Sequence, residues 1–118
     1  MNLIGMKNRV DQVNRLIKQE LGQIILREVD MSEGVVVTLT RVVASGNLQQ
    51  AKVYISVVPD KNTPEVLKSL QQDIYSIQQM LNSRLKMRPV PRIRWVLETA
   101  TAEAQKIEEL LDQIKKER

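Results

Sequence analysis

The sequence contains no cysteine, no histidine and no phenylalanine, and aromatic residues make up only 3% of its 118 positions. Without cysteine, no disulfide can hold the fold and no thiolate can act as a nucleophile. Without histidine, the chain lacks the commonest general base at neutral pH, and the absence of both removes the usual ligands of zinc and copper. These absences argue against an enzyme and against a transition-metal site.

The residues that are present exclude further classes of protein. None of the 14 carboxylates lies in a spacing that gathers oxygens around calcium or magnesium, and the 4 glycines lie too far apart for a phosphate-binding loop. No apolar run approaches the ~20 residues that a membrane span needs, and the first residues lack the pattern of a secretory signal. We therefore expect a cytoplasmic protein without catalytic activity, metal, cofactor, small-molecule substrate or membrane partner.

Hydrophobic periodicity predicts the secondary structure of one domain over residues 1–118, with a core within about 6–114. Apolar residues at steps of three and four predict helices over about 6–27, 64–86 and 101–114. The second helix is long for such a domain, so we expect a kink or a break within it. Alternation predicts strands at 35–43, 51–57 and 92–97. In the first strand the alternation slips by one residue, which predicts a bulge near Thr40–Arg41.

The order of these elements predicts an α+β protein with a three-stranded mixed sheet. The first two strands form an antiparallel hairpin, and the helical crossover places the third strand parallel to the second. The helices can cover only one face of this sheet well. We expect the second helical segment to pack on that face, and the phase of Trp95 places it there also, whereas Tyr54 has the opposite phase. The packing residues are Leu67, Leu70, Ile74, Ile77, Leu81 and Leu85 on the helix and Ala51, Val53, Ile55 and Ile93 on the strands.

The basic residues are concentrated in one stretch. Residues 74–97 contain no acidic side chain, and their formal charge of +5 exceeds the +4 of the whole chain. Such a local positive field attracts polyphosphates, because each neutralised phosphate releases condensed counterions. The candidate RNA-binding residues in this stretch are Arg84, Lys86, Arg88, Arg92 and Arg94, of which the first three are expected to be exposed.

Each candidate also has a structural alternative. Cations near the end of a helix stabilise its dipole, and cations on a strand protect the edge of a sheet. Lys7 and Arg9 on the first helix are further candidates, although carboxylates on the same helix can pair with its cations.

Several short motifs, taken in order, resemble one known family. They are Arg9-Val10, Val42 with Ser45 and Asn47-Leu48, the string AKVYIS at 51–56, Met87-Arg88-x-x-Pro91-x-Ile93-x-Trp95, and Lys106-Ile107-x-x-Leu110-Leu111. Together they cover about residues 7–114 and resemble ribosome-binding factor A, a family of bacterial assembly factors of the small ribosomal subunit.

The resemblance implies a type II KH-like fold in the order helix-strand-strand-helix-helix-strand-helix. It also implies a factor, monomeric when free, that binds the 16S rRNA of immature small subunits late in assembly, assists its maturation or processing without catalysis, and supports growth in the cold. The sequence departs from the family pattern at two places in the long helical segment. Asp73-Ile74-Tyr75 stands where the family usually has an Ala-x-Gly kink, and Gln78 replaces an expected Arg. The alternative is a KH-like module that docks a protein partner through its sheet face or its first helix.

Overall fold

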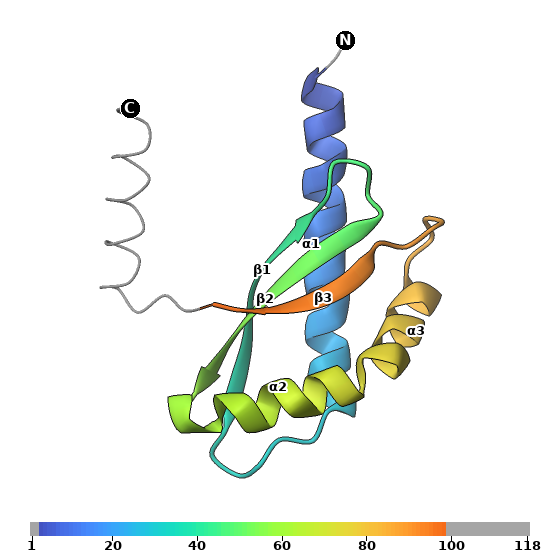
Figure 1. Cartoon of the computed structure of the whole chain (residues 1–118). Coiled ribbons are helices and arrows are strands. Elements are labelled where there is room, and N and C mark those ends of the chain that lie inside the picture. The colour runs from blue at the N-terminus through green and yellow to red at the C-terminus, as the bar shows by residue number, and fades with distance from the viewer. Residues whose placement is uncertain (1–2, 99–118) are drawn as a thin grey trace, which may run out of the picture.

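The computed structural model describes the backbone of residues 3–98 and the side chains of residues 9–98. The predicted helix over 101–114 lies outside this range. The elements (Figure 1) are α1 (Leu3–Glu28), β1 (Val36–Ala44), β2 (Gln50–Val58), the short 3-10 helix η1 (Asp60–Asn62), α2 (Thr63–Gln72), α3 (Ile74–Arg84) and β3 (Arg92–Leu97).

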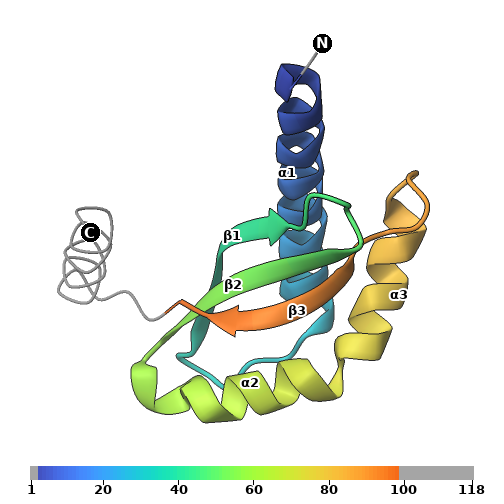
Figure 2. The same cartoon turned by 45° about the horizontal axis from the view of Figure 1, so that its top comes forward.

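The sheet has the predicted topology. β2 is the central strand, antiparallel to β1 and parallel to β3, and Figure 2 shows it between its two neighbours. The antiparallel pairing follows from the short hairpin turn after Ala44. The parallel pairing follows from the crossover through η1, α2 and α3, which carries the chain back to the start of the sheet.

The predicted bulge in β1 is confirmed. The register of β1 against β2 shifts between Leu39 and Arg41, so that Thr40 is the extra residue. Before the bulge Leu39 lies opposite Ile55, and after it Val42 lies opposite Val53. Because one residue is added, the side chains that face the helices change from odd to even positions along β1.

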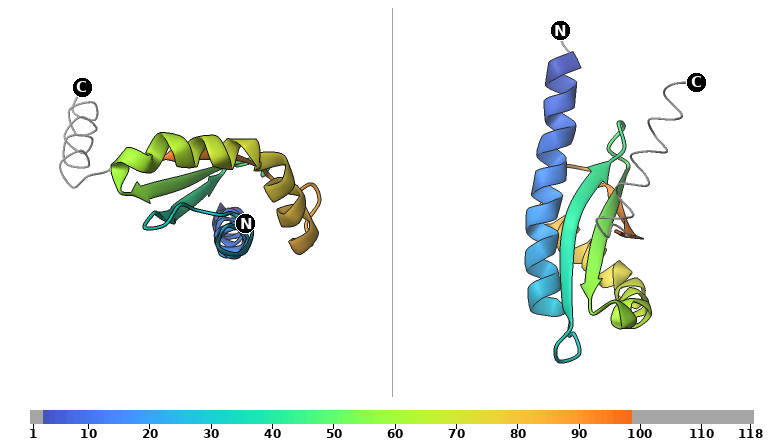
Figure 3. Two further views of the ribbon diagram at one scale, coloured as in Figure 1. Left: turned by 90° about the horizontal axis from the view of Figure 1, so that it is seen from below. Right: turned by 90° about the vertical axis from the view of Figure 1, so that its left-hand side faces the viewer.

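The helices bury one face of the sheet. α1 lies along the sheet (Figure 3) and buries a stripe at helical spacing, which includes Ile17, Leu21 and Ile24, each fully shielded from solvent. On β2 every second side chain, such as Val53 and Ile55, is fully buried beneath the helices. This strict alternation is the signature of a sheet with one covered face and one open face.

The long helical segment breaks in two, as predicted. α2 ends at Gln72 and α3 begins at Ile74, so that Asp73 alone separates them. The break forms although no glycine is present there. Its effect on the core was only partly predicted: Val66 is buried in α2, whereas Leu67 is only partly buried. The break explains this difference, because the buried side chains of α2 and α3 no longer have to lie on one line along a continuous helix.

The prediction that Trp95 faces the helices is confirmed, although its side chain is only partly buried. Its indole Nε1 donates a hydrogen bond to the Leu70 carbonyl oxygen of α2 at 3.1 Å. This hydrogen bond connects β3 to α2.

Glu65, in the first turn of α2, connects this helix to the loop after α1. One carboxylate oxygen accepts a hydrogen bond from Ser32 Oγ at 2.6 Å, and the other accepts one from Asn62 Nδ2 at 3.2 Å. The bond from Ser32, followed by that from Asn62, lowers the pKa of Glu65 below its ordinary value of 4.5.

The first prediction concerns the core. Leu70→Ala or Ile77→Ala should lower the free energy of unfolding by about 2–5 kcal/mol, because each leaves a cavity in a fully packed site. Urea unfolding followed by the fluorescence of Trp95 measures the loss. Leu26→Ala is the control, since this side chain is 85% exposed and its loss should change stability by no more than about 0.5 kcal/mol. A loss smaller than this at both buried positions would contradict the assigned helix faces.

The second prediction concerns acid. Since the folded-state pKa of Glu65 is lowered, its ionised form stabilises the fold above the unfolded-state pKa, and this stabilisation is lost as the pH falls through the folded-state pKa. The stability difference between the parent and Glu65→Gln should therefore be largest at neutral pH and shrink in acid. Ser32→Ala should reduce this pH dependence. A difference that grows on acidification would refute the assignment.

Candidate nucleic-acid interface

The three strands carry four basic side chains and no acidic one. All four project from the face opposite the helices, since they alternate with buried residues. We call this surface the open face, and its basic residues are Arg41, Lys52, Arg92 and Arg94.

Strand register brings these residues together. Lys52 lies between Val43 of β1 and Arg94 of β3, and Arg92 lies opposite Gln50. Like charges directly opposite one another on neighbouring strands destabilise a sheet, because their side chains are close. The pairing of Lys52 with Arg94 therefore favours an anionic ligand, which would relieve this repulsion.

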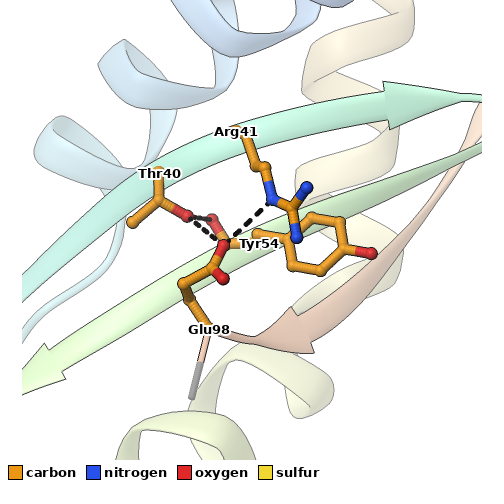
Figure 4. Close-up of polar contacts among 4 residues, drawn as sticks. All are labelled: Thr40, Arg41, Tyr54 and Glu98. Atoms are coloured by element: carbon orange, nitrogen blue, oxygen red, sulfur yellow. Dashed lines mark hydrogen bonds and ion pairs between the residues drawn. The ribbon is translucent and has the colours of Figure 1, made fainter. Parts of the chain in front are cut away.

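Arg41 occupies the next row of the open face and is held in place by its neighbours (Figure 4). Its guanidinium carbon lies 3.9 Å from the centroid of the Tyr54 ring. Its Nε donates to Glu98 Oε2 at 3.0 Å. Thr40 Oγ1 lies 3.1 Å from the same carboxylate oxygen and 3.2 Å from the Tyr54 carbonyl oxygen, and can donate to either. Within residues 9–98, the terminal nitrogens of Arg41 have no hydrogen-bond partner, so they are available to a ligand.

The structure directs Arg84, at the end of α3, toward α1. Arg84 was expected to be exposed, and this was wrong: its side chain is only 27% exposed. Its Nη1 donates to Glu20 Oε2 and Gln23 Oε1, both at 3.1 Å. The reason is tertiary, because α3 ends against α1 and the two helices place these groups together.

Arg88 and Lys86 lie in the loop before β3 and remain exposed. Arg88 Nη1 donates to the carbonyl oxygens of Leu85 and Met87 at 2.7 and 2.6 Å, so this side chain folds back on its own loop. Lys86 makes no polar side-chain contact within the described part of the chain. These two residues form a second, smaller basic group.

Among the remaining candidates, Arg9 is exposed on α1, which packs against the opposite face of the sheet. The side chain of Lys7 lies outside the described residues. Sequence reasoning missed Arg41 and Lys52. The signal was present in both cases, because the predicted bulge turns Arg41 outward and Lys52 alternates with the buried residues of β2.

Gln78 connects α3 to the start of β3. Its Oε1 accepts a hydrogen bond from the Ile93 amide at 2.8 Å, and its Nε2 donates to the Pro91 carbonyl oxygen at 3.1 Å and to Asn82 Oδ1 at 3.0 Å. The residue that departs from the family pattern therefore has a structural role in this chain.

An apolar groove of about 510 Å³ lies between α1 and β1, with the exposed side chains of Leu26 and Val36 among its lining residues. The groove borders the first helix, which is one of the two surfaces, with the sheet face, that the alternative of docking a protein partner would use. Within the described residues, no group of three or more carboxylates could hold a metal ion. No helix in that range is long and apolar enough to cross a membrane.

Comparison with known proteins agrees with this architecture. A family model described as ribosome-binding factor A matches residues 9–111. Ribosome-binding factor A of Bdellovibrio bacteriovorus is 32% identical over 119 aligned positions, which cover 100% of this chain and 89% of the relative.

A crystal structure and a fitted homology model share the fold at lower sequence identity. The crystal structure of ribosome-binding factor A from Thermus thermophilus has a TM-score of 0.67 at 20% identity, and the match covers 77% of this chain and 98% of that one. A homology model of the Thermus thermophilus factor, fitted into a cryo-EM map of its 30S complex, has a TM-score of 0.58 at 19% identity and covers 70% and 88%.

The fold defines a small α+β protein whose mixed sheet has helices on one face and basic side chains on the other. The chain belongs to the ribosome-binding factor A family, since the family match spans most of its length.

The third prediction concerns Arg84. Because its ion pair with Glu20 is partly shielded from solvent on both sides, a double-mutant cycle of Glu20→Gln and Arg84→Gln should give a coupling energy of about 1 kcal/mol. Lys86→Gln is the matched control and should not couple to Glu20→Gln. Additive effects of Glu20→Gln and Arg84→Gln would show that the pair does not stabilise the fold.

Proposed function

We propose that this protein is a non-catalytic assembly factor that binds immature small ribosomal subunits and assists the late maturation of 16S rRNA. Membership of the ribosome-binding factor A family supports this proposal, as does the 30S complex of a relative with the same fold. The observation that carries it is the open face, whose strands hold four basic side chains and no acidic one. Glu98, directly after β3, pairs with Arg41, and the other three cations have no acidic partner within residues 9–98. We expect the protein to act in the cytoplasm, as a monomer when free.

The mechanism is occupancy. A sheet braced by α1, α2 and α3 is a rigid support, so its basic side chains meet rRNA phosphates without a large ordering cost. Each phosphate contact releases condensed counterions, which makes the affinity strongly dependent on salt. The bound protein holds one local arrangement of rRNA until maturation displaces it. No step of this mechanism requires a nucleophile, a general base or a metal.

The fourth prediction tests the open face. Lys52→Gln/Arg94→Gln should lower the affinity for immature small subunits roughly 10- to 100-fold, since charge-assisted contacts to phosphate are lost. The slope of log affinity against log salt should shrink by about 0.7–0.9 for each phosphate contact removed. Co-sedimentation over a salt series measures both quantities, and cells that carry the variant should accumulate precursor 16S rRNA.

Two control variants accompany this experiment. Lys61→Gln/Lys68→Gln removes the same charge from exposed positions on η1 and α2 and should bind like the parent. Lys86→Gln/Arg88→Gln measures the contribution of the second basic group. Parental affinity and salt slope in both Lys52→Gln/Arg94→Gln and Lys86→Gln/Arg88→Gln would count against binding through these basic residues. Binding of the parent that is insensitive to salt would favour a protein partner instead.

A further inference from the structure

On the open face, Arg41, Tyr54 and Glu98 form a cluster whose geometry is more specific than the attraction of a phosphate requires. The guanidinium of Arg41 is stacked on the Tyr54 ring at 3.9 Å, and Glu98 holds its Nε at 3.0 Å. Two planar groups are thus placed one on the other at the surface, where the Arg41 side chain remains 56% exposed. A cation that only attracts phosphate needs neither a stacking partner nor a fixed plane.

We propose that the Arg41–Tyr54 stack is a subsite for an unpaired nucleobase, so that the open face takes single-stranded RNA. This inference rests on the proposed function and specifies the form of RNA that the open face binds. An incoming base extends the stack on the exposed side of the guanidinium, or against the Tyr54 ring where it is accessible.

The chemistry of both groups suits a base. An arginine plane is weakly hydrated for a cation and stacks on aromatic rings, which a lysine ammonium cannot do. Nucleobases likewise stack on aromatic side chains and on guanidinium planes when they are splayed out of a helix. The terminal nitrogens of Arg41, free within residues 9–98, can donate to base carbonyl or ring nitrogen acceptors as well as to phosphate.

The surrounding residues fix where the backbone of the RNA would run. Lys52 lies two residues along β2 from Tyr54, roughly 7 Å away, and Arg94 lies beside Lys52 on β3. They can hold phosphates beside the stacked base. Glu98 lies on the other side of Arg41, where its carboxylate repels phosphate. The RNA backbone is therefore directed toward the Lys52 side of the cluster.

A duplex does not fit this subsite. Bases within a helix are already stacked on both sides, so a base must leave the helix before it can reach Arg41, at a cost in stacking and pairing. The remaining basic residues of the open face can contact duplex phosphates, but the stack then contributes little beyond one charge. Preference for the single strand should therefore depend on the two planar groups.

The test compares a ten-nucleotide single-stranded RNA with an RNA hairpin of equal phosphate number whose loop is a base-free synthetic linker, so that the hairpin presents no unpaired base. Both RNAs bind to the full-length protein. Arg41→Lys keeps the charge and removes the plane, and Tyr54→Leu removes the ring beneath it. Each should weaken single-strand binding roughly 5- to 150-fold, the range expected for loss of one stacked base. Hairpin affinity and the salt slope should be unchanged. Single strands that contain 5-iodouridine should photo-crosslink to the peptide that contains Tyr54.

Tyr75→Leu is the matched control, because this tyrosine is 74% exposed on α3 and lies beside Arg92 rather than beside Arg41 and Tyr54. It should leave binding of both RNAs unchanged. Thermal melting verifies that each variant is folded, and if Tyr54→Leu is not, Arg41→Lys decides the outcome.

Three outcomes would overturn the inference: parental single-strand affinity in Arg41→Lys, an equal loss for strand and hairpin, or a loss in Tyr75→Leu instead. Failure of the inference differs from failure of the proposed function. If only the subsite is wrong, the parent still binds immature subunits with a steep salt slope, and Lys52→Gln/Arg94→Gln reduces that slope. Substitution of Arg41 or Tyr54 then does not change the preference of the protein for single strands. If the proposed function is wrong, the salt-dependent binding of subunits is absent as well.

Discussion

The arrangement of this molecule depends on one extra residue, the bulged Thr40 of β1. With the helices packed on a single face of the sheet, each strand residue has only two possible environments, and the phase of the strand decides between them. Without the bulge, β1 could not place both Leu39 and Val42 under the helices. One half of the strand would then expose its apolar side chains, and Arg41 would point into the core. The same irregularity therefore completes the apolar layer and places a guanidinium on the opposite surface.

The distribution of charge shows how tertiary structure reassigns residues that look alike in the sequence. Arg84 and Arg94 lie in the same acid-free stretch, but they serve different purposes. Arg84 meets Glu20 from another helix and stabilises the contact between α3 and α1. Arg94 meets Lys52 from the neighbouring strand, and no carboxylate of the strands lies beside this pair. The first pair is internally neutral, whereas the second remains positive and is available to an anion.

Most of the fold could be predicted from local pattern. Periodicity identified the helices and strands of the described chain, although not the short η1, and the phase slip located the bulge, because a strand with one buried face leaves a direct imprint on its sequence. The placement of Val66 rather than Leu67 in the core depended on where the helix breaks, which no glycine or proline marks. The candidate site was harder to predict, because Arg41, Lys52, Arg92 and Arg94 come from three strands and only the register unites them. The pairing of Arg84 with α1 likewise required the packing of two helices far apart in the sequence.

The side-chain amide of Gln78 has a consequence for how β3 meets other chains. The amides of Arg92 and Glu98 donate toward β2, so the Pro91 carbonyl and the Ile93 amide point away from the sheet. On an outer strand such groups are a template for another polypeptide to add itself as a fourth strand. Gln78 accepts a hydrogen bond from the Ile93 amide and donates one to the Pro91 carbonyl, as an incoming strand would. Gln78 therefore occupies the first pair of outward backbone groups from within the molecule, so that an incoming strand cannot pair there, at the place where the chain enters β3.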